Sequence, residues 1–109
     1  MIIDIDVINE LKEIMEDDFD ELISIFISDG QVQIDNLKKA IDSSNVDDAR
    51  RIAHTLKGSS ANLGVLDLSE TCKQLEHKAA EGSLENANEL LEKIISFFNE
   101  TKKILENNF

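Results

Sequence analysis

The residues best suited to chemistry lie around His54, near the middle of the chain. A neutral imidazole nitrogen is a good nucleophile near neutral pH. Lys57 follows three residues later, so in a helix its ammonium would lie on the same side as the imidazole. A phosphoryl group on His54 would be a dianion, and Lys57, with Arg50 or Arg51, could stabilise that charge. Two interpretations fit these residues: His54 carries a phosphoryl group, or it is a solvated surface histidine with no special role.

A helix from Val46 to Leu63 would turn His54 toward solvent. At 3.6 residues per turn, the apolar and small side chains of this segment gather opposite the histidine. They are Val46, Ala49, Ile52, Ala53, Leu56, Ser60 and Leu63. The side that carries His54 holds Asp47, Arg50, Arg51, Lys57, Gly58 and Ala61. Three of the 11 basic residues thus surround one histidine, on a chain of formal net charge −12.

Gly58 lies one turn after His54 on that side, inside the predicted helix. Glycine in a helix interior costs about 1 kcal/mol relative to alanine. On an exposed face, core packing cannot offset this cost in helix stability. We therefore interpret Gly58 as a position where the absence of a side chain has a function. The missing side chain would let the surface of another protein approach the imidazole.

The other polar residues of interest have ordinary interpretations. Ser60 fits best as a small residue that allows close helix packing, because no acid–base partners accompany the serines. Cys72 is the single cysteine and fits a small, partly buried core residue. His77 is expected on the surface. Two histidines far apart in sequence are a weak metal signal, so no metal site is predicted.

Apolar residues recur at three- and four-residue steps along most of the chain, which is typical of amphipathic helices. The predicted helices run from Asp4 to Glu16, Asp18 to Asp42, Val46 to Leu63, about Leu66 to Glu81, and Leu84 to about Glu106. Four long helices with short connections favour an all-α, antiparallel up-and-down four-helix bundle. The additional short N-terminal helix would pack across one end or one side. We expect a single domain over residues 1–109.

Residues that favour helix ends flank these segments. The candidate N-caps are Asp4 or Asp6 for the first helix, Asn45 for the third and Ser83 for the fifth. Gly64 and Gly82 are suited to the positions just after the third and fourth helices. Gly30 falls inside the second helix, where we expect it to weaken the helix or mark a kink.

The composition agrees with a helical domain and limits its partners. There is no proline and there are only 4 glycines, fewer than turn-rich β folds need. The strong net negative charge argues against nucleic acid or an anionic membrane as a partner, because both require a basic footprint. No segment resembles a signal peptide or reaches the apolar length that spans a bilayer, so we expect a cytoplasmic protein.

Residues 53–64 read Ala-His-Thr-Leu-Lys-Gly-Ser-Ser-Ala-Asn-Leu-Gly. This segment resembles the signature of histidine-containing phosphotransfer (HPt) domains, which reads His-x-x-Lys-Gly-small-small with a further glycine ten residues after the histidine. The matching positions are His54, Lys57, Gly58, Ser59, Ser60 and Gly64. A looser resemblance covers most of residues 45–100, through the Ala/Arg-rich lead-in at 48–53, Leu75-Glu76 and the turn Glu81-Gly82.

The resemblance implies an antiparallel four-helix bundle with an extra short helix. His54 would be the phosphoacceptor, Lys57 would assist the phosphoryl group, and Gly58 would leave room for the partner. Some members of the family hydrogen-bond the histidine through a glutamine at the position of Glu76. Here either Glu76 or Gln74 could make that bond.

The same resemblance implies receiver domains of response regulators or hybrid histidine kinases as partners, with the receiver supplying an aspartate and a Mg²⁺ site. Members of the family carry the phosphoryl group but do not phosphorylate themselves. This chain has no glycine-rich nucleotide loop, and after His54 it lacks the Glu and Pro of the dimerisation helix of true histidine kinases. We therefore expect a phosphocarrier with no autokinase activity, no cofactor and no bound metal.

The partner is expected to cover His54, Ala61 and the edge of an adjacent helix. The first helix is the candidate, because Ile5, Ile8 and Leu11 make it more apolar than a short surface helix requires. Replacing Ile8 by Asp is accordingly expected to slow transfer without unfolding the bundle.

Two other interpretations compete with phosphotransfer. The first is a non-catalytic helical adaptor in which His54 is idle and His54→Gln changes nothing. The second is a metal- or small-ligand-binding bundle, which predicts a stability gain with added Zn²⁺ that substitution of His54 or His77 abolishes. No spare helical face is evident for a dimer, so a monomer is expected.

Overall fold

Helix-forming sequence dominates the protein, and the computed structural model, which describes residues 2 to 108, is helical with no strand in that range. Its elements are α1 (Ile5–Met15), the 3₁₀ turn η1 (Glu16–Asp18), α2 (Phe19–Asp42), α3 (Val46–Asn62), α4 (Leu66–Ala80) and α5 (Ala87–Asn108). The predicted all-α class is confirmed. Within the same residues, no helix is long and apolar enough to cross a membrane.

Two of the three predicted N-caps are present. The Asp4 carboxylate accepts hydrogen bonds from the backbone N–H groups of Asp6 and Val7, at 3.1 and 3.4 Å. The Asn45 side chain accepts from the N–H of Asp48 at 3.1 Å. These bonds satisfy backbone donors that have no partner inside the helix, so they fix where α1 and α3 begin.

The predicted start of the fifth helix is wrong by three residues. Ser83 accepts a hydrogen bond from the N–H of Glu85 at 3.1 Å, but this bond closes a local turn and starts no helix. Asn86 then adopts a left-handed conformation with φ +62°, which interrupts any helix through it. For this reason α5 begins only at Ala87. The predicted ends at Gly64 and Gly82 are confirmed by their positive φ angles, +72° and +82°.

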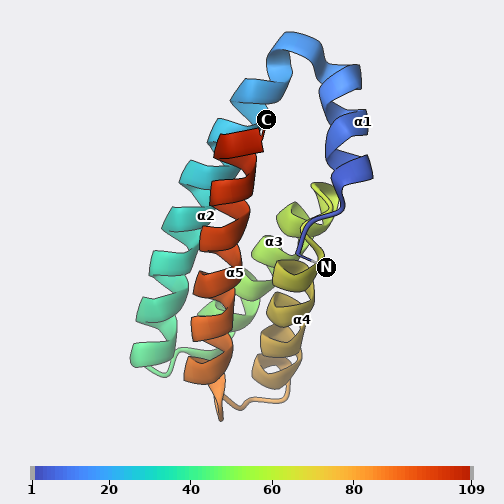
Figure 1. Ribbon diagram of the computed structural model, residues 1–109. Coiled ribbons are helices and arrows are strands. Elements are labelled where there is room, and N and C mark those ends of the chain that lie inside the picture. The colour runs from blue at the N-terminus through green and yellow to red at the C-terminus, as the bar shows by residue number, and fades with distance from the viewer. Residues whose placement is uncertain (1, 109) are drawn as a thin grey trace.

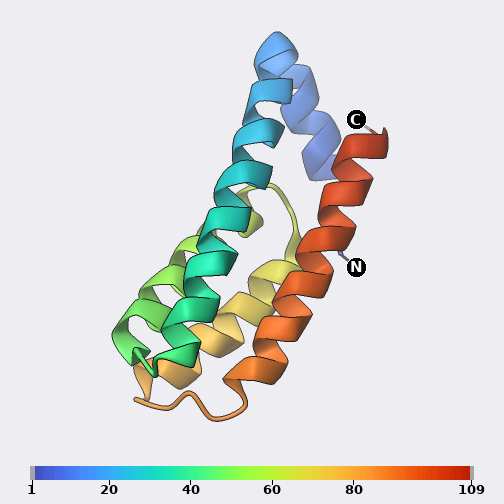
Figure 2. The same ribbon diagram turned by 90° about the vertical axis from the view of Figure 1, so that its left-hand side faces the viewer.

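The four long helices form an antiparallel four-helix bundle. Each of α2, α3 and α4 packs against the next helix, and α5 closes the bundle against α2. Figures 1 and 2 show that α2 and α5, the two longest helices, project beyond the α3–α4 hairpin at one end. From the tip of α2, α1 folds back toward the turn between α3 and α4 (Figure 1).

The N-terminal segment is fastened to that turn by buried contacts. The backbone N–H of Asp4 donates to the carbonyl of Gly64 at 2.7 Å, and Ile3 and Ile8 are buried in the core. Ile8 is 0% exposed, so its predicted place on a docking surface is wrong. An aspartate there would put an unpaired charge into the core and unfold this end of the molecule.

Gly30 has a packing role that the sequence did not reveal. A Cβ atom at this position would lie 2.5 Å from Cε1 of Phe98, a buried ring on α5. The same ring stacks at a tilt on Phe26, with their centroids 6.1 Å apart. The glycine therefore lets α2 approach α5 closely, and α2 continues through it without a break.

We predict that Gly30→Ala lowers the free energy of unfolding by about 1–2 kcal/mol, because overpacking against Phe98 outweighs the better helix propensity of alanine. Gly58→Ala is the matched control. No atom lies within 4 Å of a Cβ at that position, so alanine should stabilise the protein by about 1 kcal/mol. Urea unfolding followed by circular dichroism measures both. Stabilisation by both substitutions would contradict the close approach at Gly30.

Candidate functional site

Helix α3 presents His54 to solvent, as its apolar periodicity predicts. The His54 side chain is 64% exposed, whereas Ala53 and Leu56 are buried beneath it. Ser60 is also buried on the core side, as expected for a residue that allows close packing. The histidine is therefore mounted on a rigid helix but remains open to a partner.

A carboxylate from the neighbouring helix holds the imidazole in place. Glu76, on α4, lies with Oε2 2.5 Å from Nδ1 of His54 and with Oε1 2.6 Å from Nζ of Lys57. Its side chain is only 14% exposed. Of the two candidates for this contact, the structure selects Glu76, whereas Gln74 is exposed. The contact brings His54, Lys57 and Glu76 into one cluster.

This geometry fixes which ring nitrogen of His54 carries the proton. An ionised carboxylate can only accept hydrogen bonds, so Nδ1 of His54 must carry the proton. In the neutral ring, the lone pair then lies on Nε2, the other ring nitrogen, which the contact with Glu76 leaves free. The site therefore holds an exposed, oriented nitrogen lone pair on the surface of the bundle.

The partners of Glu76 keep it ionised. The hydrogen bond with Lys57 lowers the pKa of the Glu76 carboxyl below its ordinary value. Burial of the carboxyl acts in the opposite direction, and the hydrogen bond with His54 assists Lys57 in overcoming it. The carboxylate thus stays charged at neutral pH and continues to accept the Nδ1 proton.

The surface of α3 is open at Gly58, one turn after His54. Gly58 is exposed, and a Cβ atom built on it would meet no atom within 4 Å. Ala61 is exposed as well. The surface of a partner protein can therefore come close to the imidazole from the side of α3 that carries Gly58 and Ala61.

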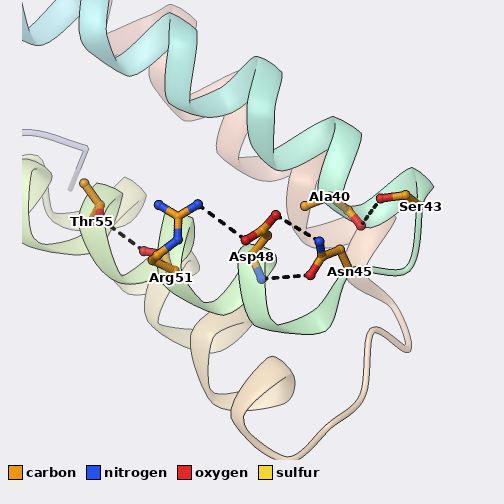
Figure 3. A network of polar contacts seen from close by, with 6 residues as sticks. All are labelled: Ala40, Ser43, Asn45, Asp48, Arg51 and Thr55. Carbon is orange, nitrogen blue, oxygen red and sulfur yellow. Dashed lines mark hydrogen bonds and ion pairs between the residues drawn. The ribbon is translucent and has the colours of Figure 1, made fainter.

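The two arginines do not join the cluster. Arg51 forms an ion pair with Asp48 at 3.5 Å, and its backbone carbonyl accepts a hydrogen bond from Thr55 (Figure 3). Asp48 in turn accepts from the side chain of Asn45. Arg50 is exposed on the same helix. Any action of Arg51 on a phosphoryl group would require it to leave Asp48.

His77 and Cys72 take the surface and core positions expected of them. His77 is exposed, and Cys72 is fully buried on α4. Burial, aided by the charge of Glu76, raises the pKa of the Cys72 thiol to about 12, so it stays protonated and unreactive. Over the described part of the chain, no group of three or more His, Cys, Asp and Glu side chains could hold a metal ion.

An apolar groove lies near the C-terminal end of α3, beyond His54 along the helix, and it was not predicted as a whole from the sequence. It has a volume of about 380 Å³ and runs between α1, α2 and the end of α3. Its lining residues are Leu11, Met15, Leu22, Ile25, Phe26, Asp29, Ser59, Asn62 and Leu63. Ile25 could have signalled it, because this large apolar residue lies off the buried stripe of α2 and is 55% exposed.

Comparison with known proteins gives one family. The sequence model of the Hpt domain matches residues 21–107. The chain is 30% identical over 104 residues to the chemotaxis protein CheA of Borreliella burgdorferi, an alignment that covers 85% of this chain and 12% of that protein. The chain thus spans about an eighth of the length of that relative.

A solved structure agrees closely with the fold. The crystal structure of histidine-containing phosphotransfer protein B (HptB) from Pseudomonas aeruginosa PAO1 matches with a TM-score of 0.94 and 30% sequence identity. The match covers 96% of this chain and 91% of that chain. The similarity therefore includes nearly the whole molecule.

We predict that Lys57→Met raises the pKa of the Glu76 carboxyl toward its ordinary value of 4.5, because Lys57 is the main cause of its depression. An NMR titration of the side-chain carboxyl carbon measures this pKa. Lys102→Met, which removes an exposed ammonium from α5, is the control and should leave the pKa of Glu76 unchanged. Equal Glu76 pKa values in the wild type and Lys57→Met would contradict the ion pair.

The same shift carries a pH dependence of stability. A carboxyl whose pKa is lower in the folded state stabilises the protein above its unfolded pKa, and this contribution disappears as the pH falls through the folded pKa. The wild type should therefore lose this contribution to its free energy of unfolding as the pH falls below 4.5. Lys57→Met should lack the contribution at every pH, so acidification should destabilise it less.

Proposed function

The chain belongs to the Hpt domain family, and on that premise we propose that His54 accepts a phosphoryl group and exchanges it with aspartates of receiver domains. The family and both relatives support the coarser role of a phosphotransfer intermediate in two-component signalling. The observation that carries the finer proposal is the exposed imidazole whose Nδ1 is held by Glu76.

The transfer is a displacement at phosphorus. The Nε2 lone pair of His54 attacks the phosphorus of an aspartyl phosphate, the N–P bond forms, and the P–O bond to the aspartate breaks with its electrons leaving on the carboxylate. The proton on Nδ1 stays where it is, so the phosphorylated ring carries a positive charge. The Glu76 carboxylate, 2.5 Å from Nδ1, stabilises that charge. The reverse reaction returns the phosphoryl group to an aspartate.

Lys57 is placed to assist the phosphoryl group. Its ammonium lies 2.6 Å from Glu76 and its side chain is partly exposed, one turn from His54. A dianionic phosphoryl group on Nε2 would compete with Glu76 for this ammonium. We propose that Lys57 shares its hydrogen bonds between the two once the histidine is phosphorylated.

The receiver domain is proposed to cover His54, Gly58, Ala61 and the apolar groove. The open surface at Gly58 permits close approach, and the groove lies next to it along α3. Leu11 lines the groove, and Ile5 is exposed near the start of α1. Partly exposed apolar residues beside a polar site are typical of docking surfaces. Ile8 has no part in this surface because it is buried.

Carriage without autokinase activity is proposed as well. The family consists of phosphotransfer carriers rather than kinases, and the sequence holds no glycine-rich loop that could cradle a nucleotide. The competing proposal is an adaptor that binds partners while His54 stays idle. The fate of a phosphoryl donor separates the two.

Incubation with phosphoramidate, a small phosphoryl donor for histidine, should add one phosphoryl group to the wild type. His54→Gln should take up none, because it lacks the nucleophile, and His77→Gln, the control, should behave as the wild type. Intact mass spectrometry before and after acid treatment measures the acid-labile product. No uptake by folded wild type, or equal uptake by His54→Gln, would overturn the proposal.

Substitution of Ile25 by Asp should slow transfer between the protein and a receiver domain by about tenfold at low protein concentration, because a charge would enter the apolar contact. Phosphoramidate labelling should stay at the wild-type rate, since Ile25 lies on α2, outside the cluster of His54, Lys57 and Glu76, and its side chain is exposed.

Val32→Asp is the matched control for that experiment. Val32 is 54% exposed on the same helix but does not line the groove. Its substitution should leave receiver transfer unchanged. If both aspartate variants slow transfer equally, the effect is one of charge and the groove is not the docking surface.

A further inference from the structure

One face of α4 contacts the helix that carries the histidine at two polar points. Ser69, Cys72 and Glu76 recur at three- and four-residue steps, which places them on one side of α4. Cys72 is buried between the other two, and Ser69 is half-buried. Glu76 makes the contacts with His54 and Lys57 described above. Ser69 makes the second contact, and neither family resemblance nor periodicity drew attention to it.

The hydroxyl of Ser69 donates a hydrogen bond to the backbone carbonyl of Lys57 at 3.1 Å. That carbonyl belongs to the peptide bond between Lys57 and Gly58. A carbonyl oxygen has two lone pairs, so it can accept from Ser69 in addition to its helical partner. The bond therefore ties α4 to α3 at the one interior position of α3 where a glycine loosens the backbone.

Two attachments along one face fix how the helices lie against each other. Ser69 and Glu76 are seven residues apart, about 10 Å along α4 at 1.5 Å per residue. Helices α3 and α4 already pack closely against each other, and the bond from Ser69 adds a directed polar attachment to that packing. The position required of the Glu76 carboxylate is narrow, because the carboxylate must meet two atoms at once.

We propose that Ser69 is a positioning residue for the phosphotransfer site. It acts through Glu76: by fixing α4 against the Lys57–Gly58 peptide bond, it holds the carboxylate at Nδ1 of His54 and so keeps the lone pair on Nε2. Ser69 itself touches neither the imidazole nor the transferred group in this role. The inference rests on the proposed function for its effect on rate, but its effect on the imidazole tautomer is independent of phosphorylation.

The test compares Ser69→Ala, which removes the hydroxyl, with Ser69→Thr, which keeps it. Imidazole ¹⁵N shifts at about pH 8.5, where histidines are ordinarily neutral, report the tautomer of His54. The wild type and Ser69→Thr should show Nδ1–H as the dominant form. Ser69→Ala should show a mixture of the two tautomers, and its labelling by phosphoramidate should be severalfold slower.

Thr71→Val is the control for the loss of a hydroxyl from α4. The Thr71 hydroxyl donates to the carbonyl of Asp67 within the same helix, at 2.8 Å, so its removal costs a similar hydrogen bond without releasing α3. The tautomer and the labelling rate should match the wild type. If Thr71→Val reproduces the effect of Ser69→Ala, the role of Ser69 is general stability and the proposal fails.

A double-variant comparison tests whether Ser69 acts through Glu76. In a Glu76→Ala background, Ser69→Ala should cause no further change in tautomer or rate, because the group it positions is gone. A full additional loss would overturn the proposal. A wild-type tautomer in Ser69→Ala alone would overturn it too. If His54 takes up no phosphoryl group in any variant, yet Ser69→Ala alters the tautomer, the proposed function fails and the positioning role stands.

Discussion

The site depends on one shielded carboxylate that joins two helices. Glu76 extends from α4 to α3 and meets His54 and Lys57 with separate oxygen atoms. A carboxylate with so little exposure would be costly to keep ionised without such partners. Lys57 supplies the compensating charge. His54 and Lys57, the two residues proposed to meet the phosphoryl group, therefore also stabilise the Glu76 carboxylate that orients the imidazole. The relative position of α3 and α4 is therefore a chemical requirement as well as a packing outcome.

The division between buried and exposed residues on α3 serves the same end. The core side of α3 is built from small and aliphatic residues, of which Ala49, Ala53 and Ser60 allow neighbouring helices to approach closely. The opposite side keeps His54 accessible and Gly58 bare. A rigid support and an open reactive face are needed together, because a carried group must be oriented on one protein and still be reached by another.

Helix α1 adds to this arrangement from outside the region that matches the family model, which begins at residue 21. It is fastened to the turn after α3 through the bond from Asp4 to Gly64, and Ile8 anchors it in the core. Once so placed, it contributes Leu11 and Met15 to the apolar groove beside α3. Helix α1 thus forms one wall of the apolar groove, which the four-helix bundle alone would leave open.

Features that depend on neighbours along the chain could be predicted from the order of the residues. Helical periodicity, the cap at Asn45 and the outward direction of His54 all follow from residues within a few positions of each other, as does the glycine end at Gly64. Four other features depend on the packing of distant helices. They are the contact of His54 with Glu76 rather than Gln74, the burial of Ile8, the close approach of α5 at Gly30, and the hydrogen bond from Ser69 to Lys57. Each of these depends on which residue of a distant helix lies opposite, and that is set by the packing of the whole bundle and not by any local pattern.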